Sequence, residues 1–135
     1  MNSFPLKIVT PDGLIFDGQA EQLTVRTTSG DMGILAGHIN CVAPLGMGRA
    51  TVVDADGNRR YAACIGGMLS VQNGEVSLVP TTFEWAESID AARAQLSQER
   101  AEKVLSNKDA TANDIRLAEA RLHRALVRKS VASYK

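Results

Sequence analysis

The chain lacks several features that define large classes of proteins. Only two of its 135 residues are cysteines, Cys41 and Cys64, and their separation matches no metal-binding or redox motif. No apolar run approaches the roughly 20 residues that cross a bilayer, and the start, MNSFPLKIVT, lacks the charged region and apolar core of a signal peptide. We therefore expect a soluble, unexported protein whose cysteines are buried free thiols in a reducing compartment.

The chain also has no net charge, but its charges are unevenly distributed. Residues 1–87 carry 5 basic and 9 acidic side chains, a balance of −4, whereas residues 88–135 carry 10 and 6, a balance of +4. Such a basic tail favours an anionic partner. Nucleic acid is not expected, because this tail has a single aromatic residue, Tyr134, to interleave with its basic side chains.

Residues 6–81 alternate short β-forming runs with turn signals. "LKIVT" precedes Pro-Asp-Gly, "LTVRTT" precedes Ser-Gly-Asp, and "MLSVQ" precedes Asn-Gly. Within "LTVRT", Leu23, Val25 and Thr27 share one face of the strand, as they do when only one face is buried. The spacing predicts eight or more short strands in an antiparallel β-sandwich or flattened barrel, which we assign to residues 1–87.

A glycine-rich segment, "SGDMGILAGH", interrupts this part of the chain. Its glycine spacing matches neither common phosphate-binding motif, so we expect a compact bulged loop. His38 at its end is either a structural or interface histidine or a catalytic base, but no nucleophile, metal-ligand or paired-carboxylate constellation accompanies it. An enzyme is therefore not expected. Gly66 and Gly67 are predicted to let strands turn and pack closely.

After Ser88 the chain loses its glycines and prolines, and apolar residues recur at helical spacing. Thr111 to Asp114 resembles a capping box that opens a second helix. We predict an antiparallel two-helix hairpin over residues 88–135, with narrow, alanine-rich apolar faces. The expected faces comprise Ile89, Ala92, Leu96, Ala101, Val104 and Leu105 in the first helix and Ile115, Ala118, Leu122, Ala125 and Leu126 in the second.

Three arginines project from one side of the second predicted helix. Arg121, Arg124 and Arg128 are spaced i, i+3 and i+7. They form either a solvated face paired with carboxylates such as Glu119 or a clamp for an anion, since guanidinium groups suit phosphate and carboxylate oxygens. The sequence leaves both interpretations open.

Five segments together resemble the epsilon subunits of bacterial F-type ATP synthases. They are "VTPDG", "SGDMGILAGH" followed by "VAPL", "GGMLSV" followed by "VSLV", "IDAARA" and "HRALVRKSVA", and they extend over essentially the whole chain. Ala36 departs from the family pattern, in which a proline usually precedes the Gly-His pair. The resemblance implies an N-terminal β-sandwich followed by a C-terminal helical hairpin.

This resemblance also implies a function. It predicts a noncatalytic subunit of the central rotor that couples proton flow to ATP synthesis, at the cytoplasmic face of the bacterial cell membrane. The implied partners are the gamma subunit, the ring of membrane c subunits and, through the hairpin, an acidic segment of beta in the alpha/beta catalytic head, where the hairpin inhibits ATP hydrolysis. Asp31 is expected to face the c ring and His38 to lie near gamma.

Several members of the family bind ATP as a regulatory ligand, and the associated motif is Ile or Leu followed by Asp-x-x-Arg-Ala. By resemblance, the ATP-binding residues here are Glu84, Ile89, Asp90, Arg93, Ala94, Arg124 and Arg128, with Arg100 as an additional candidate. Leu117 stands where strong ATP binders carry a basic residue. No obligatory cofactor or metal is expected. The same segment also has a purely structural interpretation, in which Ser88 or Asp90 caps the helix.

A second hypothesis does not place the chain in an ATP synthase. The chain could instead be a stand-alone ligand-binding β-sandwich, for example a small carbohydrate module, with an oligomerising helical tail. Such a module would expose clustered aromatic side chains. The aromatic residues before the tail lie mostly near the ends of this part or within strands; they are Phe4, Phe16, Tyr61, Phe83 and Trp85.

Overall fold

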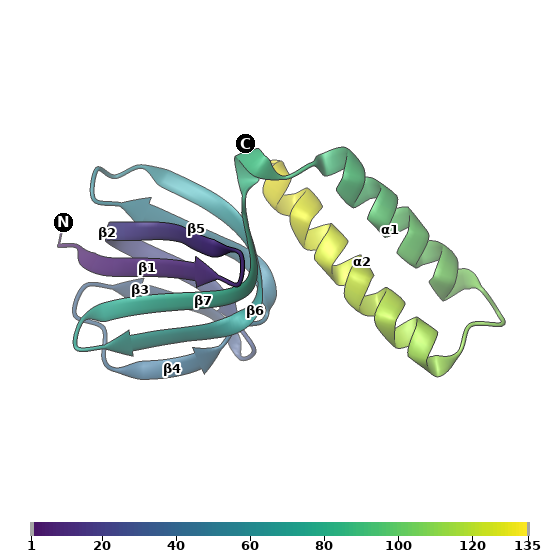
Figure 1. Cartoon of the computed structure of the whole chain (residues 1–135), viewed down its shortest axis with the longest axis horizontal. Coiled ribbons are helices and arrows are strands. Elements are labelled where there is room, and N and C mark those ends of the chain that lie inside the picture. Colours follow the sequence, from purple (N-terminus) through teal and green to yellow (C-terminus); the bar gives the residue numbers. More distant parts are fainter. Residues whose placement is uncertain (1, 135) are drawn as a thin grey trace. The chain divides into compact units, whose positions relative to one another are not determined.

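The computed structural model describes residues 2–134, and the chain divides into two compact units between Trp85 and Ala86 (Figure 1). The first unit contains only strands. They are β1 (Phe4–Thr10), β2 (Gly13–Thr27), β3 (Gly30–Leu35), β4 (Cys41–Pro44), β5 (Met47–Asp54), β6 (Arg59–Gln72) and β7 (Glu75–Trp85). The second contains a short 3-10 turn, Ala86–Ser88, and the helices α1 (Ala91–Ser106) and α2 (Ala112–Ala132). This order of strands followed by two helices confirms the predicted fold class.

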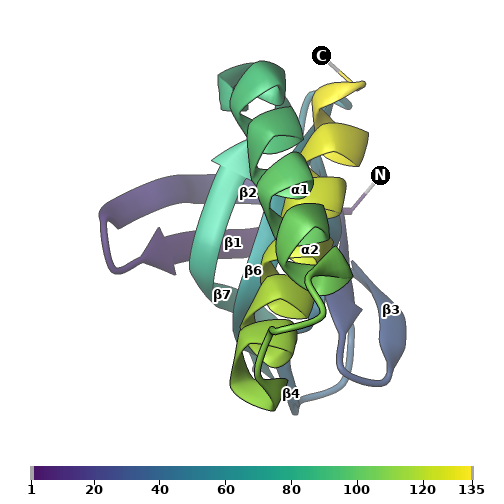
Figure 2. The ribbon, with the colours of Figure 1, turned by 90° about the vertical axis from the view of Figure 1, so that its right-hand side faces the viewer.

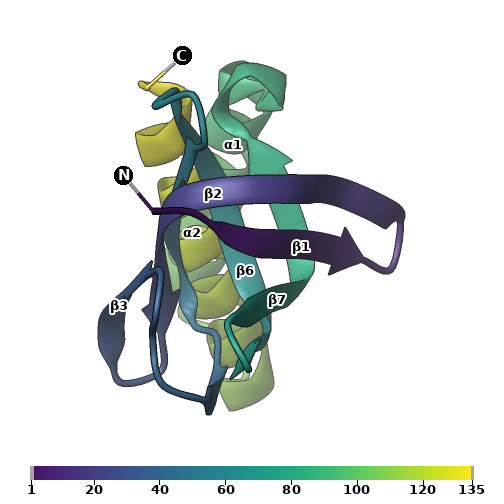
Figure 3. The same ribbon diagram turned by 90° about the vertical axis from the view of Figure 1, so that its left-hand side faces the viewer.

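Five of the strands close into a ring. β1 pairs with both β2 and β7, β7 pairs with β6, β6 with β5, and β5 with β2. β3 extends the ring beside β2, and β4 extends it beside β6. All pairings are antiparallel except that of β1 with β7, which is parallel. Figure 3 shows the long β1–β2 ribbon of this flattened barrel from one side.

The structure has seven strands, fewer than the eight or more predicted, because two of them are long. β2 has 15 residues and β6 has 14, so each serves as a partner for several neighbours in turn. The glycine-rich segment also differs from the prediction. It forms no bulged loop, since Gly30–Leu35 pairs in regular register with Gln22–Thr27. Local composition showed the turn at Ser29 but could not show this pairing.

The core of the first unit is made by alternate residues of these strands. Leu6, Ile8, Leu23, Leu69 and Leu78 are essentially inaccessible to solvent, and their strand neighbours are half-buried or exposed. Each such side chain contributes roughly 1.5–3 kcal/mol when it leaves water. The buried alternation therefore fixes which face of each strand points inward.

The two cysteines occupy different environments. Cys64 is 2% exposed within the core, and burial raises the pKa of its thiol to about 12. Cys41 is half-buried at the start of β4 and is also a free thiol. The prediction of free thiols is thus confirmed, whereas full burial holds for Cys64 alone. A thiol with so high a pKa is a poor nucleophile, so Cys64 serves packing.

The helices of the second unit begin at the predicted caps. Asp90, rather than Ser88, is the N-cap of α1, where its carboxylate accepts a hydrogen bond from the Arg93 N–H at 3.0 Å. Thr111 and Asp114 form the predicted capping box, each side chain accepting the backbone N–H of the other. Figure 2 shows the two helices side by side, joined by the loop between them. Neither helix is long and apolar enough to cross a membrane, within the part of the chain described.

The apolar face of the first helix agrees with the prediction only in part, at the buried residues Ile89 and Ala101. Ala94 and Ala101 are buried, whereas Leu96 is 51% exposed and Ala92 is also exposed. In α2 the predicted residues Ala118 and Ala125 are buried, as are Val131 and Ala132, whereas Ile115 and Leu126 lie at the surface. Alanines at seven-residue spacing let two helices approach closely, and that close approach excludes the larger side chains from the seam. The hairpin therefore buries few large apolar groups between its helices.

Candidate functional site

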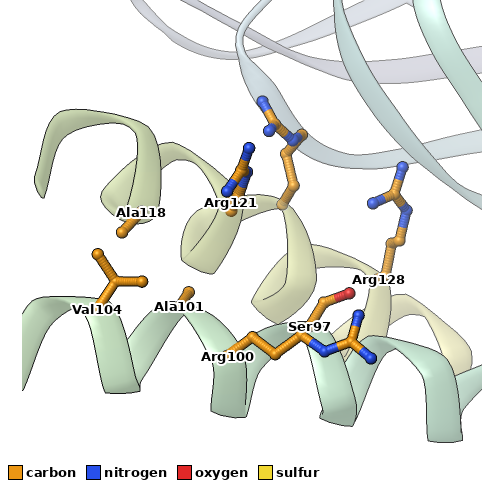
Figure 4. A pocket seen from close by; sticks show the side chains of 8 residues that line it. Ser97, Arg100, Ala101, Val104, Ala118, Arg121 and Arg128 are labelled. Atoms are coloured by element: carbon orange, nitrogen blue, oxygen red, sulfur yellow. The ribbon is translucent and has the colours of Figure 1, made fainter. Parts of the chain in front are cut away.

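A hollow of about 350 Å³ lies between α1 and α2 (Figure 4). Arginine side chains from both helices reach it, with Arg100 on α1 and Arg121 and Arg128 on α2. Its lining is formed by Ser97, Arg100, Ala101, Val104, Ala118, Arg121, Arg124 and Arg128. The hollow thus combines a floor of small side chains with a rim of positive charge.

Helical spacing explains why these residues share one hollow. On α2, Arg121, Arg124 and Arg128 stand three and four residues apart and therefore project from one side. On α1, Ser97, Arg100 and Ala101 are related in the same way. The small side chains along the seam leave space for a ligand, and the long arginine side chains line that space.

No acidic side chain lines this hollow. Within residues 2–134, no ion pair joins Arg100, Arg121 or Arg124 to a carboxylate. The predicted pairing with Glu119 is therefore absent for Arg121 and Arg124 among these residues, so these two arginines do not form an ion-paired face. Like charges gathered in one concave site repel one another, and a bound anion relieves that repulsion.

The residues predicted to bind ATP fall into three groups. Arg100, Arg124 and Arg128 line the hollow. Near the start of α1, Ile89 and Ala94 are buried, while Asp90 and Arg93 are exposed; none of these lines the hollow. Glu84 belongs to the first unit, where it is half-buried on β7 opposite Ala63. The structure thus brings three of the predicted arginines together in one site.

The capping role of Asp90 leaves it capacity to bind a ligand. One carboxylate oxygen, Oδ1, accepts the Arg93 N–H. A carboxylate has about four acceptor positions, so its other oxygen retains acceptors for an amino or hydroxyl group. The structural and the binding interpretations of this segment are therefore compatible.

Three side chains in or beside the hollow are outside the predicted ATP-binding set, although Arg121 belonged to the predicted row of arginines. Arg121 lines the hollow beside the predicted arginines, as does Ser97 from α1. Lys129 also crosses between the helices, donating a hydrogen bond from Nζ to Gln98 Oε1 at 2.8 Å. The i, i+3, i+7 spacing indicated Arg121. Ser97 and the hydrogen bond from Lys129 to Gln98 could not be predicted, because they depend on how the two helices pair.

Two further predicted residues lie in the first unit. Asp31 is exposed at the β2–β3 hairpin, where its Oδ1 lies 3.4 Å from Arg26 Nη1 across the strand pair. His38 is half-buried after β3, and its Nδ1 lies 2.8 Å from the carbonyl oxygen of Ile39. That hydrogen bond orients the ring with Nδ1 as the donor. The free thiol of Cys41 lies 4.0 Å from the same nitrogen, Sγ to Nδ1.

Three large apolar residues close to His38 in the sequence are exposed. Leu35, Ile39 and Val42 are 52%, 78% and 60% exposed. Single exposed apolar residues are common, but a group within one short segment marks an interaction surface.

Across residues 2–134 there is no group of three or more His, Cys, Asp or Glu side chains placed to hold a metal ion.

Comparison with known families accounts for nearly the whole chain. Residues 3–86 match the model of the ATP synthase delta/epsilon chain β-sandwich domain. Residues 87–133 match that of the ATP synthase delta/epsilon chain long α-helix domain. The order of the two matches is the order of the two units described above.

Individual relatives agree with these matches. The chain is 46% identical over 132 residues to the ATP synthase epsilon chain of Bacillus velezensis, covering 98% of each chain. It is 39% identical over 135 residues to the ATP synthase epsilon chain of Bacillus cytotoxicus, covering 100% of both.

Two solved structures share the fold. A chain in the mitochondrial ATP synthase of Euglena gracilis, in an assembly described as OSCP/F1/c-ring, aligns with a TM-score of 0.84 and 24% identity. That alignment covers 98% of this chain and 82% of the other. A chain in the central stalk and c ring of the Tetrahymena thermophila mitochondrial ATP synthase aligns with a TM-score of 0.61 and 14% identity, covering 95% of each. At these identities the likeness concerns the fold.

Proposed function

Because the chain belongs to the ATP synthase epsilon chain family, we propose that it is a noncatalytic subunit of the central rotor of an F-type ATP synthase. In this role it couples proton flow to ATP synthesis at the cytoplasmic face of the bacterial cell membrane, held there by the complex.

The proposed partners of the first unit are the gamma subunit and the c ring. Asp31 would face the c ring, and His38 would lie against gamma. The exposed apolar side chains of Leu35, Ile39 and Val42 support a protein partner beside His38, because a partner would remove them from water.

Co-purification tests this assignment. A tagged chain expressed with gamma and the alpha and beta subunits is expected to co-purify with them as a stable complex. An Ile39→Asp variant should co-purify less well, since it places a charge in the proposed apolar contact, whereas Leu14→Asp, at another exposed apolar residue, is the matched control. A chain that purifies alone under these conditions contradicts the rotor assignment.

We further propose that the hairpin senses ATP. The observation that carries this proposal is the hollow lined by four arginines and by no acidic residue. Guanidinium groups are suited to phosphate oxygens. Since the α1–α2 seam buries mainly alanines, ATP that contacts both helices would favour the closed hairpin in proportion to its differential affinity for that state.

We propose that the same hairpin inhibits ATP hydrolysis by the complex when no bound ATP holds it closed. Its balance of 10 basic and 6 acidic residues, +4 over residues 88–135, supports attraction to an acidic segment of beta in the alpha/beta head. Bound ATP would neutralise part of that positive charge and hold the hairpin in its closed state. Binding of ATP and inhibition of hydrolysis are therefore expected to oppose each other.

Titration of the whole chain with ATP tests the sensor. Isothermal calorimetry should detect saturable binding, and ATP at a hundred times its Kd should stabilise the chain by about 2.7 kcal/mol through mass action. For a chain of this size that corresponds to a rise in Tm of roughly 5–10 °C. Inorganic sulfate at equal ionic strength is the control. No heat and no change in Tm with millimolar ATP would contradict ATP sensing.

A further inference from the structure

Trp85, the last residue of β7, is held by two side chains of the first unit. The Cζ atom of Arg60 lies 3.7 Å from the centre of the Trp85 ring. The Phe83 ring meets the same ring edge-on, with 4.9 Å between the ring centres and 90° between the planes. Phe83 itself belongs to the core. The Trp85 ring is therefore fixed between a buried ring and a guanidinium group.

The pairing of the strands explains why these three side chains meet. Trp85 lies opposite Ala62 on β6, and Arg60 stands two residues before Ala62, so Arg60 is a diagonal neighbour of Trp85. Such neighbours are within reach of long and aromatic side chains. Phe83 and Trp85 are two residues apart on β7 and share one face of that strand. Arg60 also pairs with Val52 on β5, so its backbone is held from the other side.

Trp85 is also the last residue before the joint between the two units. β7 ends at Trp85, and the 3-10 turn begins at the next residue, Ala86. This turn belongs to the second unit, where it contacts α2 and where the Ile89 N–H donates to the Ala86 carbonyl oxygen at 3.2 Å. Strand and turn are thus directly consecutive. While both stay folded, only one or two backbone positions can absorb a change in the angle between the units.

We propose that Arg60 confines this joint to the Trp85–Ala86 junction by holding Trp85 in place. The end of a strand frays easily, because its last residues have few neighbours. Without the Arg60–Trp85 stack, the last residues of β7 would leave the sheet and lengthen the joint. Arg60 is therefore a positioning residue for the hairpin. The inference rests on the proposed function for the movement of the hairpin between its closed and inhibitory states.

A competing role for Arg60 is electrostatic, at the turn between β5 and β6. There Asp54 Oδ1 accepts the Asp56 and Asn58 N–H groups, each at 2.9 Å. The hydrogen bond from Asn58 is the main cause of a lowered pKa of Asp54, and the Arg60 charge makes a small further contribution. A lysine would keep this charge but lacks the planar group that stacks on a ring. Arg60→Lys therefore separates the two roles.

Hydrogen exchange of the full chain, followed by mass spectrometry, tests the Arg60–Trp85 stack. In Arg60→Ala, the amides of residues 83–85 should exchange about fivefold faster than in the parent, the change that corresponds to about 1 kcal/mol. Arg60→Lys should lose most of this protection as well. The emission of Trp85, the single tryptophan of the chain, should shift to longer wavelengths in both variants, because the ring gains contact with water.

Arg59→Ala is the matched control. Arg59 is an exposed arginine that precedes Arg60 on β6. Neighbouring residues of a strand point to opposite faces, so its side chain lies on the other face from Arg60. The control removes the same charge from the same end of the strand, but it should change exchange in residues 83–85 less than about twofold.

The outcomes that would overturn the inference are distinct. Parent-like exchange in Arg60→Ala, or an equal effect of Arg59→Ala, shows that the stack does not hold the end of β7. Protection preserved in Arg60→Lys assigns the effect to charge. Faster exchange throughout β6 and β7 in Arg60→Ala shows a loss of stability of the whole unit and contradicts a role confined to the joint. None of these measurements needs ATP, so a chain that does not bind ATP refutes the proposed sensor and leaves the test of the stack intact.

Discussion

Replacing Gly67 with alanine is expected to lower the free energy of unfolding by about 3 kcal/mol or more, since two costs combine. Gly67 lies within β6 with φ +102°, a backbone conformation that side chains of L residues disfavour. A Cβ built there would also overlap the carbonyl oxygen of Val79 and lie 2.6 Å from Pro80 Cα. Neither contact is with a flexible side chain, so the paired strand β7 would have to move. Urea unfolding followed by circular dichroism measures the loss.

Gly74→Ala provides the control for Gly67→Ala. Gly74 has φ +83° in the turn between β6 and β7, but a Cβ there would meet no atom within 4 Å. Its substitution should therefore cost only about 1–2 kcal/mol, the penalty for the backbone conformation alone. Equal losses in the two variants would show that the close approach of β6 and β7 at Gly67 is unimportant.

The combined substitution Arg100→Ala and Arg124→Ala is expected to weaken ATP binding at least about a hundredfold, because hydrogen bonds to charged groups are worth about 1.5–3 kcal/mol each. The two residues line the same hollow from different helices. The double variant therefore loses proposed phosphate contacts from both helices. Calorimetry with ATP gives the affinity, and the Tm without ligand reports whether the fold is intact.

A charge-matched double variant, Lys108→Ala with Arg116→Ala, is the control for this loss. Both residues are exposed and lie outside the hollow. The control removes two positive charges from the same unit, so it lowers the general attraction of the hairpin for an anion to a similar extent. If it weakens ATP binding as much as the Arg100 and Arg124 substitutions do, the hollow is not the binding site.

Much of the fold was predictable because it follows from local patterns. Alternation at Leu23, Val25 and Thr27 marked a strand with one buried face, and all three are buried. Thr111 and Asp114 marked the start of α2 through short-range hydrogen bonds that the structure contains. Such features depend on residues within a few positions of one another.

Features that depend on distant partners were predicted less well. Gly30–Leu35 reads locally as a loop, yet it is a strand because Gln22–Thr27 provides its hydrogen-bond partners. Leu96 was expected in the apolar face of α1 but is exposed, because it stands about 200° around the helix from Ala94, on the side away from the buried alanines. In both cases, packing between distant segments overrides the local pattern.

The sequence by itself determined the order of strands and helices, the cap of α2 and the row of three arginines on α2, since each depends on spacing along one stretch of chain. Only the tertiary structure decided that Arg100 joins this row around one hollow without a carboxylate. The physical reason is that the side of α1 that meets α2 is set by the fit of small alanines across the seam. Periodicity within either helix contains no information about that fit.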